Sequence, residues 1–279
     1  MKTHLTLIIS LCCFNSLQAQ TLDETFTLGK ALYEAGAEKE ADLLFQRAIF
    51  FGYGQYDSEC FAMLGEIAWK AENYQQAAQY FNGAIAAHQE ASERNRLLLR
   101  RANSLMLAGE LNLALQDLLS TDENLQDSLL KNKQFMLGTI YFVQKEFEQS
   151  SLALRRCFDK ADDQLMVETW INTAANIKHP NPRKAKRLSK YLPGLGQFYA
   201  GDIKNGINSL LLASFFVYTT INTAITYTYL EAALTIAPWL QRYYQGGFTR
   251  AEIIAQNKLD RKQFKYYEKV VALLEAEQK

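Results

Sequence analysis

The chain has 279 residues, of which 48% are hydrophobic and 22% charged, with 14 glycines and 4 prolines. This length allows one large domain or two smaller ones, and the composition excludes disordered, collagen-like and linker-like chains. The net charge is zero, but residues 20–165 hold 14 basic and 22 acidic residues, whereas residues 166–279 hold 15 and 8. The uneven charge indicates two parts with different surfaces.

Residues 1–19 are expected to be a signal peptide. A short polar start precedes an apolar run of ten residues, Leu5–Phe14, and small Ala19 lies at a suitable cleavage position. Ten residues are too few to cross a bilayer. A lipoprotein signal using Cys12 or Cys13 is the alternative, although no small residue precedes either cysteine. We therefore expect an exported protein.

Cys60 and Cys157 remain after removal of the signal peptide, and we expect both to be buried core residues. They lie almost three repeats apart in the pattern described next, so a disulfide between them is not expected. The sequence contains no cluster of cysteine and histidine residues with the spacing of a zinc site. No metal and no cofactor are therefore expected.

A repeated pattern of small and large residues occupies the first half of the chain. Small residues recur at spacings of 36, 37 and 36, and further small and large apolar residues follow each of them by twelve and sixteen positions. The three sets are Gly29, Gly65, Ala102 and Gly138, then Ala41, Ala77, Ala114 and Ser150, then Phe45, Phe81, Leu118 and Leu154. Small residues on facing helices allow close approach, and the large residue is expected to fill the gap to the next pair. Ala48 and Ala84 extend the match in the first two copies.

This pattern resembles the tetratricopeptide repeat, a helix–turn–helix unit of 34 residues. The resemblance covers residues 20–164 and implies an all-α solenoid of four helix pairs, whose concave face in that family holds a protein or peptide. An irregular helical bundle is the alternative. Residues 165–190 then supply a capping helix and a basic linker.

The resemblance also predicts a partner-binding face. The position four residues after each small residue points toward the concave face in that family, and here it holds Tyr33, Trp69, Met106 and Phe142. Polar and charged residues surround this stripe, namely Lys30, Glu34, Glu66, Lys70, Arg96 and Asn103. Such a stripe suits a peptide or helix anchored by apolar contacts. The alternative is that these side chains pack between adjacent repeats.

The segment Pro180–Pro182 is expected to break the helix before a basic cluster. No acidic residue lies between Glu168 and Asp202, and the cluster consists of Arg183, Lys184, Lys186, Arg187 and Lys190. We expect a basic collar at a membrane surface that faces anionic head groups, and no contact with nucleic acid. The alternative is an ordinary solvated charged face.

Residues 191–245 are expected to form a hydrophobic helical hairpin in a membrane. A short helix from Leu192 to Ala200, a left-handed stop at Gly201 and a helix cap at Asp202 precede an uncharged stretch over 207–225. A second, weaker apolar stretch runs over 227–240. The alternative is a segment packed entirely against the protein's own core.

The hairpin region resembles membrane segments that follow tetratricopeptide repeats in bacterial envelope proteins. The resemblance rests on Leu192–Asp202, which reads LPGLGQFYAGD, and on Tyr243–Gly247, which reads YYQGG. The region is also distantly similar to the two-helix hairpin of the TM2 family. Neither resemblance implies a catalytic residue.

Residues 246–279 are expected to form an amphipathic helix. Thr249–Glu252 matches a capping box, and apolar residues recur at helical spacing from Ile253 to Leu274. This helix is expected either to pack on the repeats or to lie on a membrane surface.

Together these patterns predict a non-enzymatic scaffold or adaptor, anchored in the envelope membrane on the periplasmic side, that binds a protein or peptide. No motif combines a nucleophile, a base and an orienting group. A soluble periplasmic binding protein is the alternative. Export of the repeats would place the collar outside the inner membrane, against the positive-inside tendency.

Overall fold

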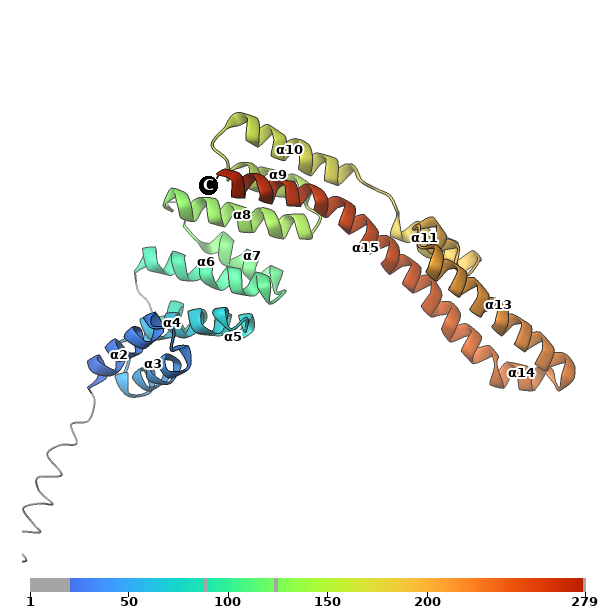
Figure 1. Ribbon diagram of the computed structural model, residues 1–279, viewed down its shortest axis with the longest axis horizontal. Helices are drawn as coiled ribbons and strands as arrows, with labels where there is room; N and C mark the ends of the chain where they lie inside the picture. Colours follow the sequence, from blue (N-terminus) through green and yellow to red (C-terminus); the bar gives the residue numbers. More distant parts are fainter. Residues whose placement is uncertain (1–20, 88–89, 123–124, 278–279) are drawn as a thin grey trace, which may run out of the picture. The chain divides into compact units, whose positions relative to one another are not determined.

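The computed structural model describes residues 21–87, 90–122 and 125–277, and the expected signal peptide therefore lies outside the described residues. The described residues form helices joined by turns, with no strand, so the expectation of an all-α protein is confirmed. The chain divides into two compact units, residues 1–140 and 141–279. Each unit is described by itself below (Figure 1).

The first unit is a series of helices in which consecutive helices pack as neighbours from α2 to α7. The helices are α2 (Leu22–Glu34), α3 (Glu38–Gly52), α4 (Asp57–Lys70), α5 (Tyr74–Ala87), α6 (Ala91–Leu107), α7 (Leu111–Ser120) and the larger part of α8 (Asp127–Val143). Thr21 begins the series with a complete capping box, because its hydroxyl accepts from Glu24 N–H and the Glu24 carboxylate accepts from Thr21 N–H.

In the first two helix pairs, the small residue faces the large residue that follows it by sixteen positions within the same pair. A Cβ atom added to Gly29 would lie 3.0 Å from Phe45 Cε1, and one added to Gly65 would lie 2.7 Å from Phe81 Cε1. Both phenylalanines are buried. Glycine is therefore required at Gly65, because a methyl group would displace the ring that fills the centre of the pair.

The turns inside the helix pairs show a second repeat that the sequence pattern did not include. Gly36, Glu72, Gly109 and Lys145 all have positive φ angles, of 81°, 59°, 86° and 67°. Their spacings are 36, 37 and 36, the same as those of the small residues. Each therefore ends the first helix of its pair in the same left-handed conformation. Two of the four positions carry a non-glycine residue, so glycine alone could not reveal this pattern.

Cys60 and Cys157 are buried, as expected, one in each unit, and neither forms a disulfide. Burial raises the pKa of the Cys60 thiol to about 12, and the carboxylates of Glu59 and Asp57 add to this rise. Because the thiolate is the reactive form, Cys60 is a packing residue and not a nucleophile.

The second unit contains the end of α8 and seven further helices among the described residues. They are α9 (Phe147–Arg155), α10 (Ala161–Asn176), α11 (Pro182–Tyr191), α12 (Leu195–Tyr199), α13 (Ile203–Thr226), α14 (Tyr229–Thr235) and α15 (Ala237–Glu277). The predicted break at residues 180–182 is confirmed, because α10 ends at Asn176 and the Asn181 side chain caps α11. The short helix expected to begin at Leu192 begins instead at Leu195.

The helix start expected near Thr249 is wrong. α15 is continuous from Ala237 to Glu277 and spans the predicted boundary at 245/246. The Thr249 hydroxyl donates to the Gln245 carbonyl oxygen at 3.1 Å, the bond of a threonine inside a helix and not of a helix cap. The second arm of the hairpin and the C-terminal amphipathic segment are thus two halves of one helix of about 60 Å.

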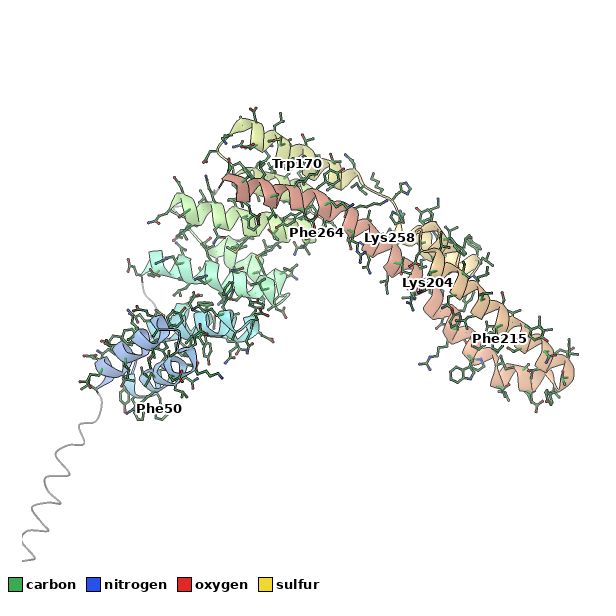
Figure 2. All side chains as sticks on the ribbon, viewed as in Figure 1. Phe50, Trp170, Lys204, Phe215, Lys258 and Phe264 are labelled. Carbon is green, nitrogen blue, oxygen red and sulfur yellow. The ribbon has the colours of Figure 1, made fainter. Side chains whose placement is uncertain are left out.

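The second half of α15 packs against α10 and the end of α8, as Figure 1 shows. The Gln263 side chain, which is buried, donates to the carbonyl oxygens of Ala174 and Ile177 at 3.2 and 3.3 Å. Lys145 donates to Gln263 at 2.9 Å and lies 2.8 Å from Asp260. These contacts satisfy the carbonyl groups at the C-terminal end of α10. Figure 2 labels Trp170 on α10 and Phe264 on α15.

A close junction of α11, α12, α13 and α15 explains the LPGLGQFYAGD segment. A Cβ atom added to Gly196 would lie 2.0 Å from the Ala185 carbonyl oxygen. The Ser189 hydroxyl accepts from Gly196 N–H at 3.0 Å and donates to Gln197 Oε1 at 2.9 Å. The buried Gln197 amide then donates to the Gly247 carbonyl oxygen at 3.0 Å. A chain of hydrogen bonds therefore links three of the four helices.

The turn before α13 has the predicted chemistry. Gly201 has a φ of 73°, and the Asp202 carboxylate accepts from Asn205 N–H at 3.1 Å. Hydrogen bonds from Asn205 lower the pKa of Asp202, with a smaller contribution from nearby Lys258 and Arg250. Lys258 also donates to the Gly201 carbonyl oxygen at 2.8 Å. This turn is therefore fixed by α15 (Figure 2).

Helix α13 is long and apolar enough to cross a membrane, the one such helix that the described residues contain. Its length of about 36 Å exceeds the hydrocarbon thickness of about 30 Å. Only 11% of its most apolar window is buried. α13 lies beside the first half of α15, with Phe216 and Tyr243 ring centroids 5.7 Å apart, and α14 connects the two. The pair forms a hairpin with an exposed apolar surface.

Candidate functional site

The predicted partner-binding residues of the first unit lie on α2, α4 and α6, the first helices of three pairs. Tyr33, Trp69 and Met106 are all half-buried. Trp69 packs against the core cluster that includes Phe81 and Leu97, and its indole N–H is buried without a hydrogen-bond partner in the described structure. Each of these side chains therefore packs partly against the core and is partly exposed to solvent.

Lys70 joins the first two helix pairs. Its ammonium nitrogen lies 4.3 Å from the centroid of the Tyr33 ring and 3.1 Å from Glu38 Oε1. The hydrogen bonds with Tyr33 and Glu38 raise the pKa of Lys70. A cation over an aromatic face, held also by a carboxylate, fixes the position of the ring.

Glu66 and Arg100 form the corresponding link between the second and third pairs. Arg100 Nε lies 2.8 Å from Glu66 Oε1, and Arg100 Nη2 donates to Glu66 Oε2 at 2.9 Å, which is a bidentate pair. Burial raises the pKa of Glu66, while Arg100 and Lys70 act in the opposite direction. The charges on this face are thus largely paired with one another.

The remaining predicted residues of this face are not all brought together. Arg96 is exposed and pairs with Glu93 of its own helix at 2.6 Å. Lys30 is exposed and lies 5.5 Å from the Phe26 ring centroid. Glu34 is exposed and Asn103 is half-buried.

Phe142 departs from the prediction. It belongs to the second unit, is 1% exposed, and its ring centroid lies 5.1 Å from that of Tyr267 and 6.0 Å from that of Phe264. The C-terminal half of α15 therefore covers it, and Phe142 is a core residue that leaves no surface for a partner.

Two residues of the link between pairs, Glu38 and Arg100, were absent from the prediction. Arg100 lies 34 positions after Glu66, about one repeat minus one helical turn. Opposite charges at that separation face each other on neighbouring first helices. The spacing therefore identifies Arg100 in the sequence, and Arg96, one turn earlier with the same charge, pairs with Glu93 and not with Glu66.

The predicted basic collar lies on α11, and three of its five residues contact α12 or α15. Lys186 lies 2.6 Å from Glu252, Lys184 lies 5.1 Å from the Tyr199 ring centroid, and Lys190 lies 5.1 Å from that of Phe248. Arg183 and Arg187 are exposed. Ala185, on the same helix, is fully buried at the junction. The collar therefore includes residues that hold α11 on α15.

Within the described residues there is no group of three or more acidic, cysteine or histidine side chains arranged to hold a metal ion. No protein-family model matches the sequence, and no curated protein matches it. A functional interpretation therefore depends on the contacts described above.

Proposed function

We propose that this chain is a non-enzymatic scaffold of tetratricopeptide-repeat type, tethered to the cell-envelope membrane by the α13–α15 hairpin, that binds a protein or peptide on the face made by α2, α4 and α6. The observation that carries the proposal is the exposed apolar surface of α13, on a chain whose other part is a series of repeated helix pairs.

The repeat assignment is supported by two independent periodic features. The small residues pack against large residues of the following helix in the first two pairs, and a left-handed residue recurs at the same spacing in four turns. A helix–turn–helix unit repeated at 36 or 37 residues is slightly longer than the 34 residues of the tetratricopeptide repeat. Stacking of such units buries a continuous core.

The membrane assignment is supported by the kind of side chains that α13 exposes. A helix in the core of a soluble protein buries its large apolar residues, whereas those of α13 are mostly open. The exposed set on this helix is Ile203, Ile207, Leu211, Phe215, Val217, Tyr218, Ile221 and Ile225. Lipid chains would cover this surface without a protein partner.

The partner assignment is supported by the mixed character of the α2, α4 and α6 face. Half-buried Tyr33 and Trp69 offer apolar area on fixed rings, and the paired charges of Lys70, Glu66 and Arg100 surround them. Aromatic anchors with a polar rim are typical of a site for a peptide or helix.

Membrane attachment is tested by fractionation of cells that express the full chain. We expect the chain to stay in the membrane pellet after washing with high salt and with alkaline carbonate, and to be released by detergent. The matched control replaces Leu211 and Phe215, two exposed apolar residues of α13, by lysine, and carbonate is expected to release it. Release of the unmodified chain by carbonate would contradict the tether and would instead support a soluble periplasmic binding protein.

Partner binding is tested by photo-crosslinking in intact cells. Tyr33→p-benzoyl-phenylalanine is expected to give a discrete adduct with one protein, because this ring lies on the proposed binding face. The same substitution at Leu119, which is 62% exposed on α7, serves as the control and is expected to give none. Identical adducts at both positions, or no adduct at Tyr33 in a folded protein, would refute the assignment of this face.

A further inference from the structure

A cavity of about 450 Å³ opens between α13 and the first half of α15. It lies in the hairpin of the second unit. Its lining residues are Gln197, Asn205, Asn208, Ser209, Leu212, Phe216, Trp239, Arg242, Tyr243, Gly246, Gly247 and Arg250.

Part of the cavity lining is cationic and polar. Arg242 and Arg250 line it together with the amides of Gln197 and Asn208, and no acidic residue is among the lining side chains. The nearby Asp202 carboxylate already accepts two hydrogen bonds from Asn205, at 3.1 and 2.7 Å. The lining itself carries two positive charges and no negative one, and nearby Asp202 offsets part of that charge. Guanidinium groups favour phosphate oxygens.

Gly246 lies between the two arginines on the same helical face, four residues from each. A Cβ atom added there would meet nothing within 4 Å, so close packing does not require glycine. Glycine inside a helix costs about 1 kcal/mol relative to alanine. The missing side chain leaves open space between Arg242 and Arg250 that is available to a ligand.

Toward the hairpin tip the lining becomes apolar, beginning at the level of Arg242, which Tyr243 follows directly on α15. Leu212 and Phe216 follow the polar residues on α13, and Tyr243 and Trp239 lie at the corresponding levels of α15. Leu211 and Phe215, the residues beside Leu212 and Phe216 in the sequence, belong to the exposed apolar surface of α13. The lining therefore matches an amphiphile, with an anionic group at one end and a hydrocarbon chain at the other.

We propose that this cavity binds an anionic phospholipid from the surrounding membrane. The phosphate lies between Arg242 and Arg250, in the space left by Gly246, and an acyl chain runs along Leu212 and Phe216 toward Trp239. This inference rests on the membrane insertion proposed above. It adds a specific lipid site, formed inside the hairpin, to the general attraction of the α11 collar.

The test uses the full chain in uncharged dodecyl maltoside micelles, because Trp239 reports directly on the apolar end. Phosphatidylglycerol with brominated acyl chains is expected to quench Trp239 fluorescence at a mole fraction about tenfold lower than brominated phosphatidylcholine does. The contribution of Trp239 is the fluorescence of the unmodified chain minus that of the Trp239→Phe variant. Equal quenching by the two lipids would overturn the proposal without any variant.

Two variants and a matched control separate the cavity from diffuse charge attraction. Arg242→Gln with Arg250→Gln is expected to abolish the preference for phosphatidylglycerol, and Gly246→Leu to abolish it without any change of charge. Arg183→Gln with Arg187→Gln removes two charges from α11 and is expected to preserve it. Loss of the preference in the α11 variant alone would overturn the cavity site in favour of the collar.

The source of the anion is distinguished by competition with inorganic phosphate. Millimolar phosphate is expected not to reduce quenching, because it lacks the chain that fills the apolar end. Displacement by phosphate alone would refute a lipid and indicate a free-anion site. Because binding is measured in micelles, a chain that carbonate releases from membranes but that still prefers phosphatidylglycerol would refute the tether alone. A chain that stays in membranes but shows no preference would refute the lipid site alone.

Discussion

Gly196→Ala is expected to destabilise the second unit by about 3 kcal/mol or more. The added methyl group would lie 2.0 Å from the Ala185 carbonyl oxygen and 2.5 Å from the Ser189 hydroxyl. The first of these atoms belongs to the backbone of α11 and cannot rotate away, so α11 and α12 must separate. Separation also breaks the hydrogen bonds from Ser189 to Gln197 and from Gly196 to Ser189.

Limited trypsin digestion of the detergent-solubilised chain measures this effect, because α11 contains several basic residues. We expect rapid cleavage within Pro182–Tyr191 in Gly196→Ala and a lower midpoint of thermal unfolding. Gly246→Ala is the matched control: it also adds one methyl group to a helical glycine, but nothing lies within 4 Å. It is expected to raise stability by up to about 1 kcal/mol. Equal behaviour of the two variants would contradict the described junction.

Phe142→Ala is expected to cost about 3–5 kcal/mol of unfolding free energy in the second unit. The ring is 1% exposed and contacts Phe147, Phe264 and Tyr267, with centroids 5.4, 6.0 and 5.1 Å away. Its removal leaves a cavity where α15 packs on the end of α8.

Urea unfolding of the second unit is monitored by the alkylation of buried Cys157, which mass spectrometry detects. The shift of the urea midpoint gives the loss of unfolding free energy for that unit. Leu165→Ala is the control, since Leu165 is 63% exposed on α10, and we expect a change within about 0.5 kcal/mol. If Phe142→Ala kept its stability but lost the crosslink at Tyr33, Phe142 would belong to the binding face after all.

The repeated helix pairs could be predicted from the sequence because their packing is local. Gly65 and Phe81 are 16 residues apart and meet within one pair, so a fixed spacing reveals the contact. The cap at Asp202 and the break at residues 180–182 are local in the same way. These features depend on residue chemistry within a few helical turns.

The position of Phe142 and the continuity of α15 could not be predicted, because contacts distant in sequence decide them. Phe142 has the same place in its repeat as Tyr33, but Tyr267, 125 residues later, covers it. Two glycines followed by a capping-box pattern suggested a helix start at Thr249. Instead, the Gln197 hydrogen bond to Gly247 and the packing of α13 keep those residues helical.

Because α15 is uninterrupted, the number of residues between its two sets of contacts fixes the angle around the helix axis between them. Ala251 and Ala255 face α11, and Gln263 faces α10, on a helix that turns by about 100° per residue. Insertion of one residue between Ala255 and Gln263 would rotate one set away from its neighbour. Insertion of seven, close to two full turns, would nearly restore the angle while moving the two contact sets about 10 Å further apart. Natural length variation in this stretch is therefore expected to occur in steps of three, four or seven residues.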